Sequence, residues 1–281
     1  KVALHQMKRF YRNLFLHYPY ILKNQTMQNL RTNPIYLITA ILILIQAPVV
    51  LSGFANGKAF HLSKKYWLNN ERGKYNEEDK KDATVSELLY SNLELSAKGL
   101  SENAFKTAYE GYVKLIERGS INEKGILTII DFSQPSVKER LFVIDMAEEK
   151  VLIKSLVAHG KNSGLNYAKS FSNTPESNKS SLGFYLTLGT YEGSNGFSMQ
   201  LKGLEKNINN NAYDRAIVMH GADYVSQQFA SNHGYIGRSL GCPAVPTAQT
   251  QKIINTIKNG TVLFIYHPDS DYLKKSNIIN S

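Results

Sequence analysis

Short β-rich segments separated by short loops fill most of the chain after Gly125. Apolar, β-branched and aromatic residues gather in the segments 126–132, 141–146, 151–157, 183–191, 197–201, 216–219 and 262–266. Residues 147–150 are predicted to form a hairpin loop. Many strands with short loops favour a β-sandwich or a barrel-like sheet. The predicted fold class is mainly β with flanking helices (α+β).

Apolar residues at helical spacing precede the strands and recur near the end of the chain. They predict helices over 84–95, 102–118 and 248–258. Ser101 and Thr247 are the expected caps of the second and third helices, and Gly119 and Gly260 lie just after their ends.

Composition divides the 281 residues into one sizeable domain and smaller accessory regions. The predicted regions are an N-terminal basic segment with an export signal or anchor (1–57), a linker and helical region (58–122), a strand-rich domain (123–268) and a C-terminal tail (269–281). Residues 69–82 are polar and charged, as in a linker. The Asn-rich stretch 207–211 and the tail are predicted to be mobile loops.

An uncharged apolar run extends from Pro34 to Leu51, with Arg31 before it and small residues after it. A basic approach, an apolar run and small residues form the pattern of a secretory signal. The run is also close to the ~20 residues that span a bilayer, so an uncleaved anchor is the alternative. We expect an exported protein of the periplasm or cell envelope that meets the membrane only through this segment. Residues 1–26 have no assigned role.

The formal net charge of +10 indicates a moderately basic surface. Such a surface attracts polyanions, including membrane headgroups and acidic polymers. The Lys and Arg residues are spread along the chain, and no nucleic-acid-binding motif is present. We therefore predict no nucleic-acid partner.

The one cysteine of the chain, Cys242, lies between Gly241 and Pro243. A single cysteine excludes an intramolecular disulfide, and the scattered histidines provide no recognisable zinc-ligand spacing. An isolated cysteine is most often a small buried apolar residue. The flanking glycine and proline instead keep this backbone out of regular helix or central strand, as in a turn that presents its side chain. This context favours a nucleophilic thiol.

A cysteine nucleophile needs a nearby base, because an unperturbed thiol, with a pKa of about 8.5, is largely protonated at neutral pH. His159 and His220 each follow an apolar run and precede a glycine, and His233 lies in a polar loop. A histidine at the end of a strand and near the cysteine in sequence is the better candidate. Spacing alone does not choose firmly among the three.

The segment from Ala216 to Pro246, AIVMHGADYVSQQFASNHGYIGRSLGCPAVP, resembles the catalytic segment of the murein L,D-transpeptidase family. That family carries an HG pair that closes a strand and, after a loop, an S-H-G-C turn that holds the nucleophile. His220-Gly221 matches the first element, and residues 239–242 match the second. The resemblance extends back through residues 141–203 and is to the branch with an SxGCPAVP turn. The combined pattern is much more specific than either half.

The resemblance implies that Cys242 is the nucleophile, that His220 is the base and that the carbonyl of Gly221 orients the imidazole. The N–H groups of Cys242 and Gly241 become candidates for an oxyanion hole. Residues 123–268 would then form a β-sandwich or barrel-like catalytic domain, preceded by a small helical region. The implied chemistry needs no metal or organic cofactor.

Two positions depart from the family pattern. The usual turn histidine is Leu240 here, and the arginine often found two places after the cysteine is Ala244. Arg238 and His233 lie close enough in sequence to replace them. The predicted oxyanion-hole or substrate-binding set is Gly241, Ser239, Arg238 and His233.

The function implied is acyl transfer on peptidoglycan stem peptides, with release of a terminal D-alanine, in cell-wall cross-linking or remodelling. The partners would be a donor and an acceptor stem peptide, and water as acceptor would make the protein an L,D-carboxypeptidase. Two other classes stay open. One is a different wall cysteine peptidase that uses Cys242 with His159 or His233. The other is a non-catalytic peptidoglycan-binding module in which the turn is only structural.

Overall fold

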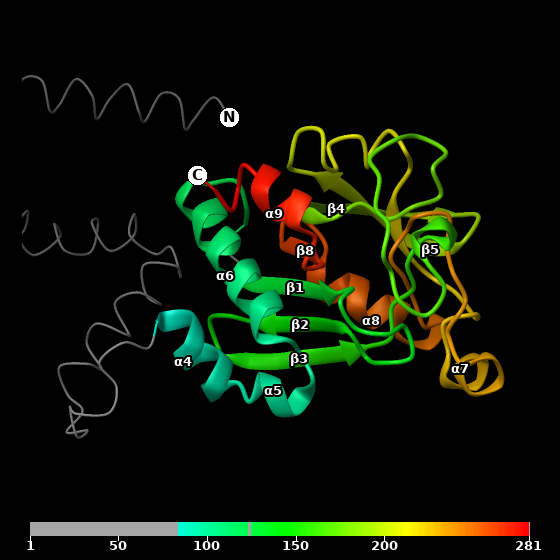
Figure 1. The fold of residues 1–281 in the computed structure, drawn as a ribbon, viewed down its shortest axis with the longest axis horizontal. Helices are drawn as coiled ribbons and strands as arrows, with labels where there is room; N and C mark the ends of the chain where they lie inside the picture. Colours follow the sequence, from blue (N-terminus) through cyan, green and yellow to red (C-terminus); the bar gives the residue numbers. More distant parts are fainter. Residues whose placement is uncertain (1–83, 123–124, 281) are drawn as a thin grey trace, which may run out of the picture. The chain divides into compact units, whose positions relative to one another are not determined.

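A computed structural model describes residues 84–122 and 125–280 of the chain (Figure 1). Both ranges belong to one compact unit, residues 58–281. The predicted export segment within 1–57 and the predicted linker 69–82 lie outside the described residues. Within the described ranges, no helix has both the length and the apolar composition that crossing a bilayer requires.

One mixed sheet of eight strands forms the centre of the described structure, in the order β3-β2-β1-β8-β4-β5-β6-β7. The strands are β1 (Ile126–Asp131), β2 (Leu141–Asp145), β3 (Lys150–Ser155), β4 (Gly183–Gly193), β5 (Gly196–Gly203), β6 (Val218–Gly221), β7 (Ala244–Val245) and β8 (Val262–Tyr266). The β1–β8 and β6–β7 pairs are parallel. The remaining neighbours are antiparallel.

The two outermost strands of this order approach each other. Just after β3, the Ala158 N–H donates to Ala244 O of β7 at 2.8 Å. A second bridge joins Gly160 to Ser239. These contacts nearly close the sheet, which leaves fewer unpaired edge groups. The predicted class, mainly β and barrel-like with flanking helices, is confirmed.

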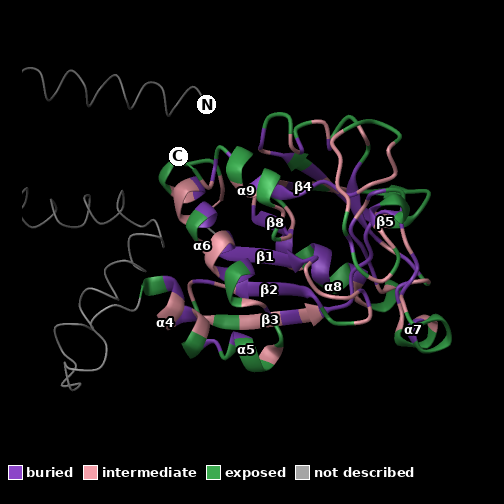
Figure 2. Cartoon of the chain, in the orientation of Figure 1, coloured by how far each residue is buried: buried purple, intermediate pink, exposed green. Residues whose placement is uncertain are grey.

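Helices flank the sheet and have exposed outer faces, and strands β1, β2 and β8 are almost entirely buried (Figure 2). The helices are α4 (Val85–Asn92), α5 (Leu95–Lys98), α6 (Glu102–Glu117), α7 (Gln227–His233), α8 (Thr247–Ile257) and α9 (Ser270–Lys275). A short 3₁₀ helix, η2, spans Lys161–Ser163. The apolar spacing of the predicted second helix corresponds to the buried face of α6.

Helix α6 packs closely on the sheet at Gly111. A Cβ atom added there would overlap the ring of Phe184 on β4. That ring stacks on Phe264 of β8, with 4.2 Å between the ring centroids. Glycine at this helical position is therefore required by packing rather than by backbone conformation.

Helix α7 and strand β7 are among the elements without a counterpart in the sequence prediction. Helix α7 lies where a polar loop was expected around His233, and its cap is Ser226, whose Oγ accepts from the Phe229 N–H at 3.2 Å. Strand β7 has two residues, Ala244 and Val245. A strand this short has no alternating pattern that sequence could reveal.

The expectation of a loop is wrong for the tail, whereas the Asn-rich stretch 207–211 does form turns. The tail forms α9, which buries Tyr272. Buried Glu205 accepts hydrogen bonds from the Phe184 N–H at 2.7 Å, from the Tyr272 hydroxyl at 3.3 Å and from the Ser276 hydroxyl. Asn209 is also buried, and its side-chain amide donates to Phe184 O at 3.0 Å. This polar network fixes both segments on β4.

Of the two predicted helix caps, Ser101 is confirmed in position and Thr247 is not. Ser101 occupies the cap position of α6, but its side chain makes no capping hydrogen bond. Thr247 is the first residue of α8, and Pro246 takes the cap position. The Thr247 hydroxyl instead donates to Asp223 Oδ1 at 2.6 Å.

Replacing Gly111 with alanine is predicted to lower the free energy of unfolding by about 1–3 kcal/mol, because the new methyl group overpacks against Phe184. In an unobstructed helix the same change would stabilise by up to about 1 kcal/mol. Urea unfolding measures the difference. The control is Gly189→Ala, where nothing lies within 4 Å of the new Cβ. A Gly111→Ala protein as stable as the parent would contradict the close packing.

Candidate active site

Strands β6 and β7 bring the predicted base and nucleophile together. They run parallel, with His220 opposite Ala244. Cys242 lies two residues before Ala244, so the register places it level with Val218, two residues before His220. The Val218 N–H donates to Cys242 Sγ at 3.5 Å, as this alignment requires. Cys242 and His220 are therefore diagonal neighbours on adjacent chain segments.

Hydrogen bonds hold the turn that precedes Cys242. Ser239 Oγ accepts from the Gly241 N–H at 3.0 Å and donates to Cys242 O at 2.6 Å. Ser180 Oγ donates to Gly241 O at 3.2 Å. Gly241 has φ +130°, a conformation that favours glycine. Ser239 thus acts on the turn itself, and it occupies the Gly241 N–H that the sequence marked as an oxyanion donor.

The Cys242 thiol is partly buried between two backbone groups. Its Sγ donates to Ala216 O at 3.7 Å and accepts from the Val218 N–H. Burial raises the pKa of the thiol, while the Val218 N–H and the charge of Arg215 oppose that rise. A thiol with a raised pKa is neutral at pH 7, so it needs a base to become a nucleophile.

His220 is oriented by the backbone beside it. Its Nδ1 donates to Gly221 O at 2.9 Å, because a carbonyl oxygen can only accept. This tautomer leaves Nε2 as the basic nitrogen. Helix α8 packs so tightly here that a Cβ added at Gly221 would lie 2.5 Å from Thr250 Oγ1. Close packing against Thr250 therefore explains why residue 221 is a glycine. The carbonyl of the same residue is the group that orients the His220 ring.

His159, the first alternative base, is fully buried. Its Nδ1 accepts from Arg140 Nη2 at 2.8 Å, and its Nε2 donates to Gly164 O at 3.2 Å. Burial, and then the charge of Arg140, lower the pKa of His159 to about 3. Because both ring nitrogens have partners inside the protein, His159 has no nitrogen to offer Cys242.

Arg140 explains why a neutral histidine is needed there. It is fully buried, and its guanidinium also donates to Val157 O at 3.0 Å and Gln134 O at 2.7 Å. The guanidinium lies 4.7 Å from the centre of the Phe132 ring, an arrangement that favours the cation. Burial lowers the pKa of Arg140 to about 9. His159 thus serves as an acceptor for a buried cation.

His233 and Arg238 have partners other than the thiol. His233 is exposed at the end of α7, where its Nδ1 donates to Phe229 O at 3.0 Å and its ring stacks on that of Phe229 at 4.1 Å. Arg238 donates to Lys161 O and Gly164 O, each at 3.3 Å. Arg238 therefore holds the loop around η2 and not the nucleophile turn.

Two residues near the thiol were not identified from the sequence. Arg215 and Cys242 interact electrostatically. Burial and the neighbouring Cys242 raise the pKa of Tyr224 to about 12. Both residues lie outside regular strands and helices, so no periodic pattern marks them. The one sequence feature that could have drawn attention to Arg215 is its position, one residue before the segment that carries the family resemblance.

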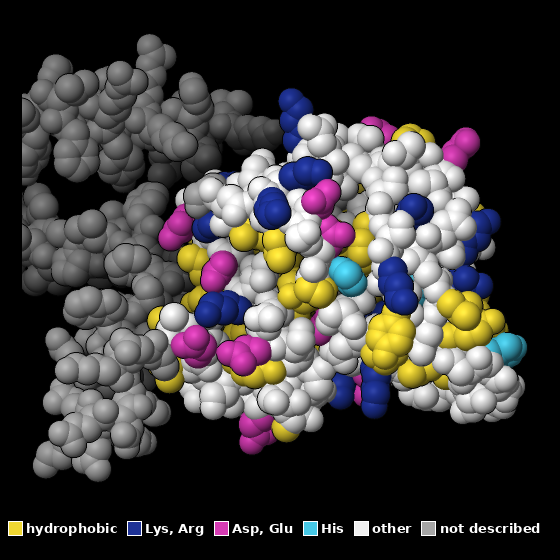
Figure 3. All heavy atoms as spheres, in the orientation of Figure 1, with side chains coloured by type: hydrophobic (Ala, Val, Ile, Leu, Met, Phe, Trp, Pro, Cys, Tyr) yellow, Lys and Arg dark blue, Asp and Glu magenta, His cyan; other side chains and the backbone are white. Residues whose placement is uncertain are grey.

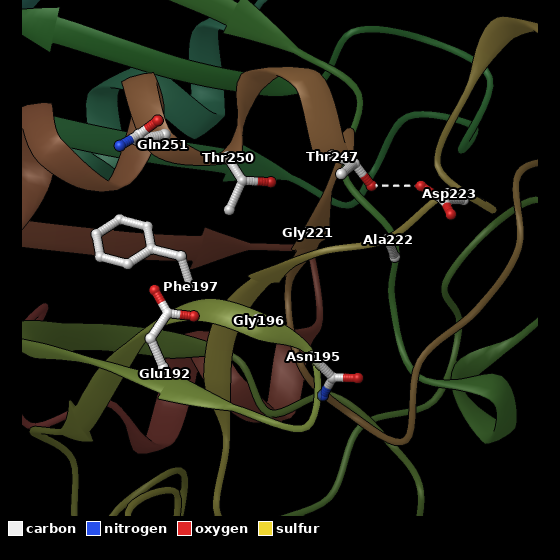
Figure 4. A pocket seen from close by; sticks show the side chains of 10 residues that line it. All are labelled: Glu192, Asn195, Gly196, Phe197, Gly221, Ala222, Asp223, Thr247, Thr250 and Gln251. Atoms are coloured by element: carbon white, nitrogen blue, oxygen red, sulfur yellow. Dashed lines mark hydrogen bonds between the residues drawn. The ribbon is translucent and has the colours of Figure 1, made fainter.

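A cavity of about 610 Å³ lies between the tip of the β4–β5 hairpin and the start of α8 (Figure 4). Glu192 and Phe197 line it from the hairpin, and Thr247 lines it from the helix. Gly221 forms part of its wall, so the cavity adjoins the backbone that orients His220. Cys242 is not among the lining residues. The cavity is therefore separate from the thiol.

The described residues offer no ready metal site. Within 84–122 and 125–280, no three His, Cys, Asp or Glu side chains are grouped to hold a metal ion. On the face shown in Figure 3, basic and acidic side chains are interspersed. The chemical groups that the site contains are a thiol, an imidazole, a guanidinium, a phenol and backbone amides.

A family model described as the L,D-transpeptidase catalytic domain matches residues 96–266. The chain belongs to this family. The matched range includes His220 and Cys242, together with α6 and all eight strands of the sheet. The resemblance inferred from the HG pair and the nucleophile turn is therefore confirmed at the level of the family.

Solved structures of L,D-transpeptidases are also similar to the chain. One from Mycobacterium smegmatis is 12% identical with a TM-score of 0.33, over 51% of this chain and 59% of that chain. One from Xylanimonas cellulosilytica is 13% identical with a TM-score of 0.30, over 69% of this chain and 100% of that chain. The chain thus spans less than two thirds of the Mycobacterium smegmatis protein. No curated protein sequence matches the chain.

The lowered pKa of His159 predicts that acid destabilises the fold. Unfolded His159 would titrate near 6.5, whereas folded His159 titrates at about 3. Between these values the unfolded state binds more protons, so stability falls as the pH falls below about 6.5. From pH 7 to pH 5, His159 should account for a loss of about 2 kcal/mol in the free energy of unfolding.

Urea unfolding of the parent and of His159→Gln at pH 7 and pH 5 measures this loss, because glutamine cannot titrate. His233→Gln, at an exposed position, is the control and should keep the parental pH dependence. Equal pH dependence of His159→Gln and the parent would contradict the buried neutral histidine.

Proposed function

We propose that the protein is a cysteine-dependent L,D-transpeptidase that acts on peptidoglycan stem peptides. The observation that carries the proposal is the hydrogen bond from His220 Nδ1 to Gly221 O at 2.9 Å, which leaves Nε2 basic on the strand beside Cys242. Family membership supports the class of reaction. The engagement of both His159 nitrogens argues against a peptidase that pairs Cys242 with His159.

In the first step, His220 Nε2 accepts the proton of the Cys242 thiol. The thiolate attacks the carbonyl carbon between the L-centre of the diamino acid and the terminal D-alanine. A carbon–sulfur bond forms, the carbon–nitrogen bond breaks, and the proton held by His220 passes to the departing amine. The products are free D-alanine and a thioester on Cys242.

The negative oxygen of the tetrahedral intermediate needs donors that are already in place. The Cys242 N–H is one candidate, because it lies near enough to its own sulfur to help lower the pKa of the thiol. The Gly241 N–H is the second, and it would have to share its hydrogen with Ser239 Oγ or be released from it. The φ of +130° at Gly241 brings successive amides into this turn.

In the second step, an amine of another stem peptide attacks the thioester and loses its proton to His220. A new amide forms, and the thiolate leaves and recovers the proton from His220. Water in place of the amine would give the L,D-carboxypeptidase reaction. Because peptidoglycan lies outside the cytoplasm, we propose that residues 34–51, which precede the described residues, export or anchor the protein.

Intact-protein mass spectrometry with a tetrapeptide stem that ends in D-alanine tests the proposal. We expect an adduct equal to the stem minus D-alanine on the native chain and none on Cys242→Ala. An adduct that lacks more of the stem than its D-alanine would indicate attack on a different bond. Absence of both adduct and turnover, from protein that binds sacculi, would favour the non-catalytic binding module.

The three histidines are distinguished by acylation rates in a single turnover. We expect His220→Gln to slow acylation by at least about 100-fold, since general base catalysis contributes about 10²–10⁴-fold. His233→Gln should acylate at nearly the parental rate, because its ring stacks on Phe229 at the protein surface. A larger loss in His233→Gln than in His220→Gln would assign the base differently.

A further inference from the structure

Arg215 lies three residues before β6, the strand that carries His220, and its guanidinium donates to groups of a single loop, residues 172–181. Nη1 donates to Ser172 O at 2.8 Å and to Ser181 Oγ at 2.7 Å. Nη2 donates to Lys179 O at 2.7 Å and to Ser177 Oγ at 3.2 Å. The planar guanidinium of arginine can donate these four hydrogen bonds at once, whereas the ammonium group of lysine cannot reproduce this geometry.

The guanidinium also lies close to the turn that precedes Cys242. A Cβ added at Gly241 would lie 3.5 Å from Arg215 Nη2 and 2.9 Å from Lys179 O, which Nη2 binds. The residue after Arg215, Ala216, supplies the carbonyl that accepts the hydrogen bond from Cys242 Sγ. Arg215 therefore lies next to the turn that holds the thiol.

The charge of Arg215 has no carboxylate partner. Across residues 84–122 and 125–280, the ion pairs involve other cations, and none joins an Asp or Glu to Arg215. Its four hydrogen-bond acceptors among the described residues are neutral carbonyls and hydroxyls. Burial lowers the pKa of Arg215, and Tyr185 and Cys242 raise it again. A partly buried cation without a counterion gains most when an anion forms beside it.

We propose that Arg215 is a positioning residue that uses its charge to stabilise the Cys242 thiolate and its hydrogen bonds to hold the loop of residues 172–181 against the nucleophile turn. The proposal rests on the proposed role of Cys242 as nucleophile. Arg238, which the sequence offered as a replacement for the missing family residues, donates to the carbonyls of Lys161 and Gly164.

Other charged or titratable groups near the thiol could also affect its titration. His220 on β6 and the Tyr224 phenol are the other titratable groups of the site. Lys179 adds a cation on the 172–181 loop, but its Nζ donates to Ser170 Oγ at 2.7 Å. Tyr185 donates its hydroxyl to Ser181 O, and burial raises its pKa, so it is neutral beside Arg215.

The test is the pH dependence of Cys242 alkylation by iodoacetamide, which reports the thiolate and requires no stem peptide. We expect Arg215→Met to raise the apparent pKa of Cys242 by about one unit and so to slow alkylation at pH 7 by about tenfold. Arg215→Lys keeps the charge and should stay within about threefold of the parent. If Arg215→Met does not fold, Arg215→Gln removes the charge and keeps an amide donor.

Two controls separate charge from structure. Ser181→Ala removes one hydrogen bond to Arg215 and keeps the charge, and Lys202→Met removes an exposed charge on β5. Both should keep the parental profile. The proposal is overturned if the neutral Arg215 variants also keep that profile, if Arg215→Lys is as slow as Arg215→Met, or if Ser181→Ala shifts the profile as far.

The alkylation test and the stem-peptide test can fail separately, so failure of the Arg215 proposal is distinguishable from failure of the proposed function. A shifted alkylation profile together with no acylation by the stem peptide would leave the role of Arg215 intact and reject the transpeptidase. An unshifted alkylation profile together with normal acylation would reject the role of Arg215 and leave the proposed transpeptidase intact.

Discussion

The parallel pairing of β6 with β7 is the constraint on which the site depends. Strand β7 has two residues, yet its register sets Cys242 two positions before the partner of His220. The same strand accepts a hydrogen bond from the Ala158 N–H, which joins the outermost strands of the sheet. A change that displaced β7 would therefore open the barrel and separate the thiol from the imidazole at once.

Two histidines in similar sequence settings have opposite chemistry because of what surrounds them. Each follows an apolar run and precedes a glycine, but His159 accepts from the buried guanidinium of Arg140. His220 instead donates to the carbonyl of its own neighbour, Gly221, and retains a basic nitrogen. The distinction is electrostatic, since a cation beside His159 disfavours its protonation.

The strand segments and the second helix could be predicted because their apolar residues repeat at the period of the element they form. The tail and the Asn-rich stretch could not, because their order depends on Glu205, a buried acid that collects donors from β4 and α9. Strand β7 is too short to carry a pattern, and the predicted roles of Arg238 and His233 rested on proximity in sequence. When a loop folds back on the protein, proximity in sequence does not show which side chains are close in space.

The sequence by itself determined the family and the mainly β class and predicted a turn around Cys242, because a glycine–cysteine–proline turn and alternating apolar residues are local properties. Only the tertiary structure showed which partners each histidine ring has and which cation lies near the thiol. Those assignments depend on the partners of His159, His220 and Arg215, which come from distant segments or from a backbone conformation that packing imposes. Burial and charge are properties of the folded neighbourhood, so no short motif can encode them.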